Sequence, residues 1–240
     1  MGSKKQRRIV LKEGGSLLFD DQNKIRDTHI NDFVGILKDS PSVNALIVGG
    51  GKLARTYIQA ARSLGASESL CDTFGIEVSK LNARLIITAL KERAYPEPIS
   101  DLREARENSL WNRILVAGGF VPGQSTTSVT FQIAEALNAT DVIVLTNVDG
   151  IYDKDPRKHT SAKKFDRITI SELEKVIYGE GGASQSAAGE YRIFDAVSLQ
   201  ILKRSNISVR LANGENIDQL KRLLVTQEFE SGIGTEILRD

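Results

Sequence analysis

The chain has 240 residues, enough for one large domain or two small ones. Its 32 Lys and Arg residues nearly balance its 31 Asp and Glu residues, so no global field recruits nucleic acid or an acidic membrane surface. The single cysteine, Cys71, excludes an internal disulfide, and two isolated histidines exclude a Cys/His zinc cluster. No apolar run approaches the ~18 residues of a membrane span, and nothing resembles a signal peptide, so we expect a cytoplasmic protein with a full-sized core.

Short β-rich runs alternate with helical stretches along most of the chain. Strands are predicted at short, uninterrupted apolar runs, and helices where apolar residues recur every three or four positions. In chain order we expect a strand over 9–11, a helix over 24–38, a strand over 43–48, helices over 52–64 and 74–90, a strand over 114–117, a helix over 126–137 and a strand over 141–145. Strands that are apolar throughout suit a parallel sheet covered on both faces. The sequence therefore predicts an α/β fold, a three-layer sandwich with an open, mainly parallel central sheet.

From Gly150 onward the composition of the sequence changes. Residues 153–164 are polar and predict a surface loop, Ser171 is expected to cap a helix that ends near Tyr178, and 179–186 is a Gly- and Ser-rich stretch expected to be mobile. A helix over 195–204, a strand over 208–211 and a helix over 217–225 complete the alternation. With no repeat and no clean linker, we expect residues 1–240 to form a single domain with two lobes, about 6–145 and about 146–240.

Three predicted strands end in glycines: Gly14 and Gly15, Gly49 to Gly51, and Gly118 and Gly119. Ligands of open α/β sheets bind outside the carboxyl ends of the strands, where glycine lets backbone N–H groups approach an anion closely. One such loop can be an ordinary turn, but three in one sheet indicate a ligand with several phosphate groups. Neither G-x-G-x-x-G nor a P-loop is present, so a dinucleotide dehydrogenase and a P-loop enzyme are not expected.

Six segments resemble the amino-acid-kinase family and, within it, the archaeal type of uridylate (UMP) kinase. They are K-E-G-G-S at 12–16, G-G-G-K-L-A-R at 49–55, D-T-F-G-I-E-V-S-K-L-N-A at 72–83, G-G-F-V-P-G-Q-S-T at 118–126, T-N-V-D-G-I-Y-D-K-D-P at 146–156 and F-D-A at 194–196. The fifth is specific for the family and the fourth for its uridylate branch. The resemblance implies ATP-dependent phosphorylation of UMP to UDP in pyrimidine nucleotide biosynthesis, by a homo-oligomer (a homohexamer) that binds neither nucleic acid nor membrane.

The same resemblance assigns the catalytic and ATP-binding residues. Lys12 would bridge the transferring phosphoryl group, which suits an ammonium on a flexible stem, and Asp195 would orient Lys12. The alternatives are a solvated strand end for Lys12 and a helix N-cap for Asp195. Residues that resemble the ATP site are Gly15, Ser16, Gly51, Arg55, Thr146, Asn147, Tyr152 and Asp155. Mg²⁺ is expected to be coordinated mainly by the nucleotide phosphates, so few protein ligands need appear in the sequence.

A second set of residues resembles the site of the acceptor nucleotide. Gly50 would lie against the UMP phosphate, and Asp72 would accept hydrogen bonds from the ribose hydroxyls. Alternatively, Asp72 caps a helix that begins at Phe74. The loop expected to read the amide edge of uracil consists of Phe120, Val121, Pro122, Gly123, Gln124, Ser125 and Thr126.

Two residues depart from the family pattern. Glu13 stands where the family usually has an aliphatic residue, and its carboxylate would repel a nucleotide unless it points away or pairs with a cation. Thr127 stands where many relatives carry aspartate. Two alternatives therefore stay open. One is a kinase of another small acceptor, such as acetylglutamate, carbamate or isopentenyl phosphate, and the other is a non-catalytic nucleotide-binding protein of this fold.

Overall fold

The computed structural model describes residues 7–154, 156, 158–178, 193–229 and 232–240. These residues build a seven-stranded sheet in the order β3-β2-β1-β4-β6-β7-β5. The strands are β1 (Ile9–Glu13), β2 (Val43–Val48), β3 (Leu115–Ala117), β4 (Asp141–Thr146), β5 (Arg167–Thr169), β6 (Ser208–Asn213) and β7 (Thr235–Leu238). Only the β6–β7 pair is antiparallel, so the predicted mainly parallel sheet is confirmed.

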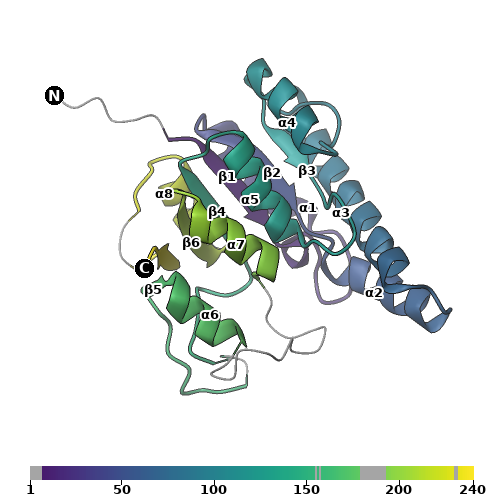
Figure 1. Ribbon diagram of the computed structural model, residues 1–240. Helices are drawn as coiled ribbons and strands as arrows, with labels where there is room; N and C mark the ends of the chain where they lie inside the picture. The colour runs from purple at the N-terminus through teal and green to yellow at the C-terminus, as the bar shows by residue number, and fades with distance from the viewer. Residues whose placement is uncertain (1–6, 155, 157, 179–192, 230–231) are drawn as a thin grey trace.

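Helices cover both faces of this sheet (Figure 1). They are α1 (Asp27–Lys38), α2 (Gly51–Ser63), α3 (Glu68–Leu90), α4 (Leu102–Asn108), α5 (Thr126–Ala136), α6 (Ile170–Tyr178), α7 (Ala196–Arg204) and α8 (Ile217–Leu224). Side chains of a strand alternate between its two faces. Val10 accordingly packs with α5 and α7 in one core, whereas Ile9 and Leu11 pack with α1, α3 and α8 in the other. The fold is thus the expected three-layer sandwich. Among the described residues, no helix has the length and apolar character needed to span a membrane.

Some boundaries and elements differ from the sequence-based expectations. Helix α3 begins at Glu68 rather than Phe74, because Ser67 caps it by accepting a hydrogen bond from the backbone N–H of Leu70. Helix α6 begins one residue before Ser171, and Thr169 takes the capping role: its hydroxyl accepts from the N–H of Glu172 at 3.2 Å. The short elements β5, β7 and α4 were not expected, because three to seven residues are too few for a clear period.

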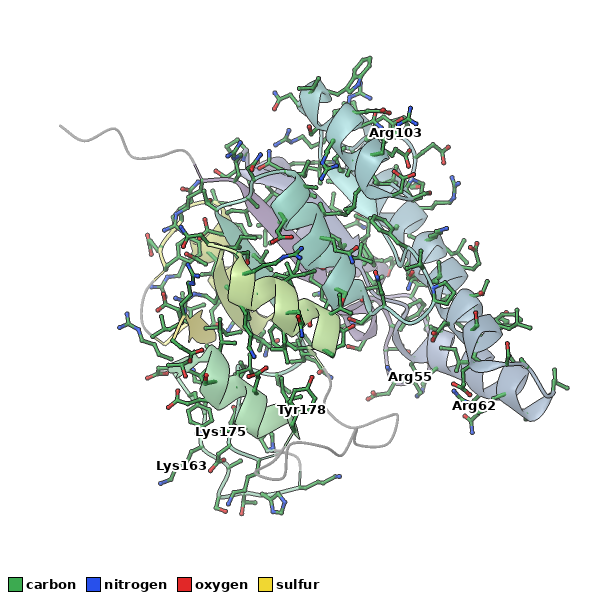
Figure 2. All side chains as sticks on the ribbon, in the orientation of Figure 1. Arg55, Arg62, Arg103, Lys163, Lys175 and Tyr178 are labelled. Carbon is green, nitrogen blue, oxygen red and sulfur yellow. The ribbon has the colours of Figure 1, made fainter. Side chains whose placement is uncertain are left out.

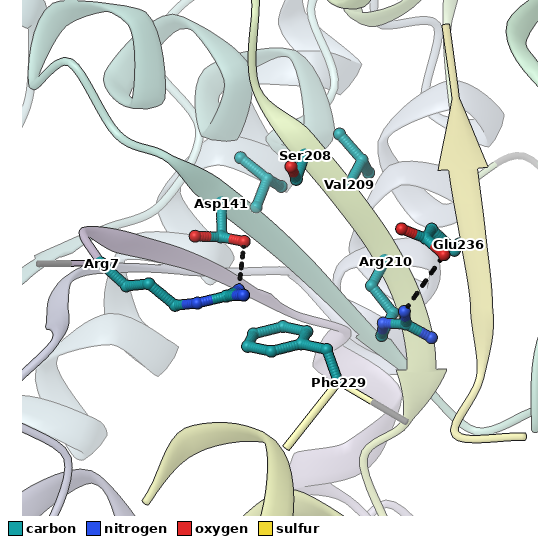
Figure 3. A pocket seen from close by; sticks show the side chains of 8 residues that line it. Arg7, Asp141, Ser208, Val209, Arg210, Phe229 and Glu236 are labelled. Carbon is teal, nitrogen blue, oxygen red and sulfur yellow. Dashed lines mark hydrogen bonds and ion pairs between the residues drawn. The ribbon is translucent and has the colours of Figure 1, made fainter. Parts of the chain in front are cut away.

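The amino-terminal edge of the parallel strands carries a polar cluster around Phe229 (Figure 3). Arg7 donates to Asp141 at 2.7 Å, and its guanidinium lies 3.8 Å from the centroid of the Phe229 ring. The buried Arg210 donates to the carbonyl of Ile233 at 2.7 Å. Because Arg7 precedes β1 and Phe229 follows α8, these contacts fasten both end regions of the chain to the sheet. This edge lies opposite the glycine loops.

Candidate active site

The three glycine loops lie next to one another, because they follow the neighbouring parallel strands β1, β2 and β3. The loops after β1 and β2 are in direct backbone contact. A Cβ atom on Gly15 would lie 2.3 Å from both the carbonyl oxygen of Gly49 and the backbone nitrogen of Gly51. Gly51 has a φ of +67°, in the left-handed region that favours glycine. Side chains are therefore excluded from this junction, which leaves backbone N–H groups open to an anion.

Lys12 lies beside this junction, on the β1 face that packs against α5. A Cβ atom built on Gly14 would be 3.8 Å from the Lys12 Nζ and 3.7 Å from the hydroxyl of Ser16. Burial lowers the pKa of Lys12 to about 8, while the nearby charge of Glu13 acts in the opposite direction. No described carboxylate forms an ion pair with Lys12. Its ammonium thus lies beside the glycine junction without an ion pair to a described carboxylate.

Glu13 points the other way, into the core that contains Ile9 and Leu11. It is 1% exposed, and neither carboxylate oxygen has a hydrogen-bond partner among the described residues. Its register partners, Val48 and Leu145, belong to the same apolar core. Burial raises the pKa of Glu13 to about 8, opposed by the charge of Lys12. Of the two expected ways to avoid repelling a nucleotide, the structure shows the first: the side chain points away.

A cavity of about 160 Å³ opens between α2, α3 and the loop after β3. It contains four of the residues expected to bind the acceptor and one expected to bind ATP. Its lining consists of Gly50, Gly51, Ala54, Ile58, Asp72, Gly75, Ile76, Ser79, Gly119, Gln124 and Thr126. Polar groups from the glycine loops and α5 thus face apolar side chains of α2 and α3, an arrangement typical of small-molecule sites.

Asp72 connects α3 with the expected acceptor loop. It lies in the second turn of α3, so the alternative role as an N-cap is wrong. One of its carboxylate oxygens accepts a hydrogen bond of 2.8 Å from the backbone N–H of Gly123, whose φ is +82°. Phe120 is half-buried against the core, whereas Val121 and Pro122 are exposed. Asp72 therefore both lines the cavity and holds the turn of the loop.

Asp195 joins the start of α7 to the start of α5. It is the N-cap of α7, accepting from the N–H of Ser198 at 2.8 Å, and it also accepts from the N–H of Ser125 at 3.0 Å. Burial acts to raise the pKa of Asp195, but hydrogen bonds from Ser128, Ser198 and Ser125 together lower it. Lys12 is not among its hydrogen-bond partners in the described chain, so the structure displays the capping role, and orientation of Lys12 stays a prediction. Ser125 caps α5, as expected.

The residues expected to bind the ATP nucleoside follow β4, the other neighbour of β1. Thr146 ends this strand, and the exposed Asn147 comes next. In the turn that follows, Asp149 accepts a 2.7 Å hydrogen bond from Asn213 at the end of β6. Half-buried Tyr152 lies further along the same segment.

The remaining two residues of the expected ATP-binding set are Arg55 and Asp155. Arg55 is exposed in the second turn of α2 (Figure 2) and forms no ion pair with a described residue. Asp155 lies outside the described residues, as does the Gly- and Ser-rich stretch 179–186.

The sequence did not single out Ser79 and Asn82, although both lie in a segment that carried the resemblance. Ser79 accepts a 2.8 Å hydrogen bond from the N–H of Gly119, and Asn82 donates at 2.9 Å to the carbonyl of Gly49. Both are buried polar residues of α3 that contact the glycine loops. A signal was available, because polar residues on the apolar face of a helix need partners.

Known proteins are similar to this chain over nearly its whole length. The model of the amino acid kinase family matches residues 7–213. The uridylate kinase of Methanothermobacter thermautotrophicus is 40% identical over 231 residues, which cover 96% of this chain and 99% of that protein. The crystal structure of uridylate kinase from Archaeoglobus fulgidus aligns with a TM-score of 0.78 at 34% identity, covering 96% of this chain and 100% of that one. An isopentenyl phosphate kinase from T. acidophilum aligns with a TM-score of 0.70, covering 96% and 100%, but at 21% identity the likeness is one of fold alone.

Proposed function

This chain belongs to the amino acid kinase family, and we propose that it is a uridylate kinase that transfers the γ-phosphoryl group of ATP to UMP. The observation that carries the proposal is the cavity in which Gly50, Asp72 and Thr126 lie together, directly beside the phosphate loop that follows Lys12. Relatives named uridylate kinase are 34–40% identical over nearly the whole chain, which favours UMP over the other acceptors of the family.

The geometry supports an in-line transfer between two phosphates held at one glycine junction. Backbone N–H groups of Gly15 and Gly51 would hold the ATP phosphates, and Gly50 would hold the acceptor phosphate. An oxygen of the UMP phosphate then attacks the γ-phosphorus while the bond to the β–γ bridging oxygen breaks, which yields UDP and ADP. Such a transfer depends mainly on alignment and charge neutralisation. Lys12 would supply the cation that follows the moving charge.

The remaining assignments complete the proposal. Ser16, Arg55, Thr146, Asn147, Tyr152 and Asp155 would contact ATP. Mg²⁺ would accompany ATP, held mainly by phosphate oxygens and water; no group of three or more His, Cys, Asp or Glu side chains in the described part of the chain could hold a metal. We further propose a cytoplasmic homo-oligomer whose single domain has an acceptor-side lobe and an ATP-side lobe.

UMP is expected to be the best acceptor, CMP a poorer one and purine monophosphates the poorest. Cytosine exchanges donor and acceptor positions relative to uracil, so fixed backbone groups of the loop 120–126 would be left unpaired. Each unpaired buried group costs roughly 1–3 kcal/mol, or about ten- to a hundredfold in specificity. Initial rates of ADP release with each nucleotide, and with isopentenyl phosphate as the contrasting acceptor, give the values of kcat/KM.

Comparable values of kcat/KM for UMP, CMP and AMP would contradict the uridylate assignment but not kinase activity. Binding of ATP and UMP without ADP release would instead support the non-catalytic alternative.

Asp72→Asn is expected to weaken the binding of UMP more than that of dUMP. Asparagine keeps an oxygen that can accept from the N–H of Gly123, so the loop tether survives. It loses the charge that strengthens hydrogen bonds from the ribose hydroxyls, and this loss is expected to lower the affinity for UMP about tenfold. Calorimetric titration of both nucleotides measures the difference. An equal loss for UMP and dUMP would restrict Asp72 to holding the loop.

The kcat/KM for ATP is expected to fall as the pH rises through about 8, where Lys12 loses its proton in the free protein. Burial has lowered this pKa from 10.5, so the cation is lost earlier than in an exposed lysine. Lys12→Arg is the matched control, because a guanidinium stays protonated throughout this range. If the kcat/KM of the parent for ATP stays constant up to about pH 9.5, the charge of Lys12 does not contribute to the use of ATP.

A further inference from the structure

Helix α3 runs past the ends of β2 and β3 and contacts the loops that follow both strands (Figure 1). Its residues Ser79 and Asn82 are each 1% exposed. Polar side chains that are buried this deeply need partners to offset their lost hydration. Both partners are backbone groups of the candidate active site rather than other side chains.

Asn82 determines the direction of one peptide group. Its side-chain amide donates to the carbonyl oxygen of Gly49 at 2.9 Å. This carbonyl and the N–H of Gly50 belong to the same planar trans peptide, so they point in opposite directions. Fixing the carbonyl toward α3 therefore also fixes the direction of the Gly50 N–H. That N–H has no acceptor among the described residues, and Gly50 lines the cavity.

Ser79 fixes the loop after β3 in a similar way. Its hydroxyl donates to the carbonyl of Ile76 at 2.7 Å and accepts from the N–H of Gly119 at 2.8 Å. The loop backbone packs directly on the helix: a Cβ atom on Gly118 would lie 2.5 Å from the Ser79 hydroxyl oxygen and 2.7 Å from the backbone nitrogen of Lys80. Gly119 and the following loop are thereby held at one distance from α3.

We propose that Asn82 and Ser79 are positioning residues for the acceptor nucleotide. Asn82 aims the Gly50 N–H at the phosphate of the acceptor, and Ser79 holds the loop that binds its base and ribose. The identity of that acceptor as UMP rests on the proposed function, whereas the two tethers rest on the geometry of α3. A purely structural role would lower global stability without a selective effect on the affinity for UMP or on the hydrogen exchange of one loop.

The experiment compares Asn82→Leu and Ser79→Ala with Ser40→Ala. Ser40 is a matched control because it is 0% exposed and its hydroxyl donates to the carbonyl of Ile36, near the amino-terminal edge of the sheet. The affinity of each variant is measured by equilibrium binding for two ligands, UMP and uridine, which lacks the phosphate. Asn82→Leu is expected to weaken UMP about tenfold and uridine little. Ser79→Ala is expected to weaken both by about the same factor. Ser40→Ala should change neither.

Hydrogen exchange in the ligand-free protein gives a readout that does not depend on turnover. Amides of 118–126 should exchange about tenfold faster in Ser79→Ala, and those of 49–51 in Asn82→Leu, relative to Ser40→Ala. If the leucine variant fails to fold, Asn82→Ala takes its place. If Ser79→Ala and Asn82→Leu match Ser40→Ala in their hydrogen-exchange rates and in their affinities for UMP and uridine, the proposal is overturned. Absence of UMP turnover in the parent would overturn the proposed function instead, while the exchange comparison still decides the tethers.

Discussion

Lys12→Ala is expected to lower kcat by roughly 10²–10³-fold, the usual effect of removing one electrostatic donor from a transition state. The ammonium lies beside the glycine junction and forms no ion pair with a carboxylate of the described chain. In the proposed mechanism this ammonium would meet the transferring phosphoryl group without an ion pair to a described carboxylate. The fold should survive, because burial disfavours the charged form of Lys12 and its removal leaves no ion pair broken. Steady-state rates and circular dichroism of the variant test both statements.

The exposed Lys175 on α6 supplies the control for that experiment (Figure 2). Lys175→Ala removes the same charge far from the glycine loops and should leave kcat unchanged. If Lys12→Ala were as active as the parent, Lys12 would have no part in the mechanism. If both variants lost activity equally, the cause would be net charge rather than position.

The sequence predicted the edge of the sheet that carries the glycine loops well because its signals are local. A continuous apolar run followed by glycines marks the carboxyl end of a buried parallel strand, and three such runs proved to be neighbours. The short edge strands β5 and β7 lack such a signal, because a three- or four-residue strand shows neither a clear period nor an obligatory turn. Their place in the sheet depends on tertiary pairing.

Contacts between distant segments could not be predicted from the sequence. The hydrogen bond from Gly123 to Asp72 spans 51 residues, and the one from Gly119 to Ser79 spans 40. Only the packing of α3 against the loops creates them. The early start of α3 explains why only the alternative role of Asp72 was wrong: with the helix placed at Phe74, Asp72 was a candidate cap in addition to its expected role at the acceptor ribose.

The direction of the Glu13 side chain could have been predicted from the alternation of side chains along β1. Ile9, Leu11 and Glu13 share one face of β1, so the carboxylate had to enter the same core as the two apolar side chains. Its position next to Lys12 in the sequence suggested closeness to the phosphates, but consecutive strand residues point to opposite faces. The repulsion expected between Glu13 and a nucleotide is therefore replaced by a cost to folding.

Glu13→Leu and Glu13→Gln are expected to stabilise the protein, increasingly as the pH rises from about 4.5 to about 8. In the unfolded chain Glu13 ionises near 4.5, whereas burial keeps it protonated in the folded chain up to about 8. The raised pKa means that the folded state binds the proton more tightly, so parent stability is full below the unfolded pKa and falls between the two values. A shift of this size, from 4.5 to about 8, corresponds to at most roughly 5 kcal/mol.

Urea unfolding of the parent and both variants at pH 5 and pH 8 measures this effect, because the titration of groups that do not interact with Glu13 cancels in the differences. Near pH 5 the ionisation contributes less than about 1 kcal/mol, so most of any gain seen there comes from removing a polar group without partners. Leucine should show that gain, while glutamine, which stays polar, should not. At pH 8 both variants should gain several kcal/mol more, because neither carries a carboxyl that must stay protonated to fold. A difference between parent and Glu13→Gln that is the same at both pH values would mean that Glu13 is ionised in the folded protein, with a cation beside it.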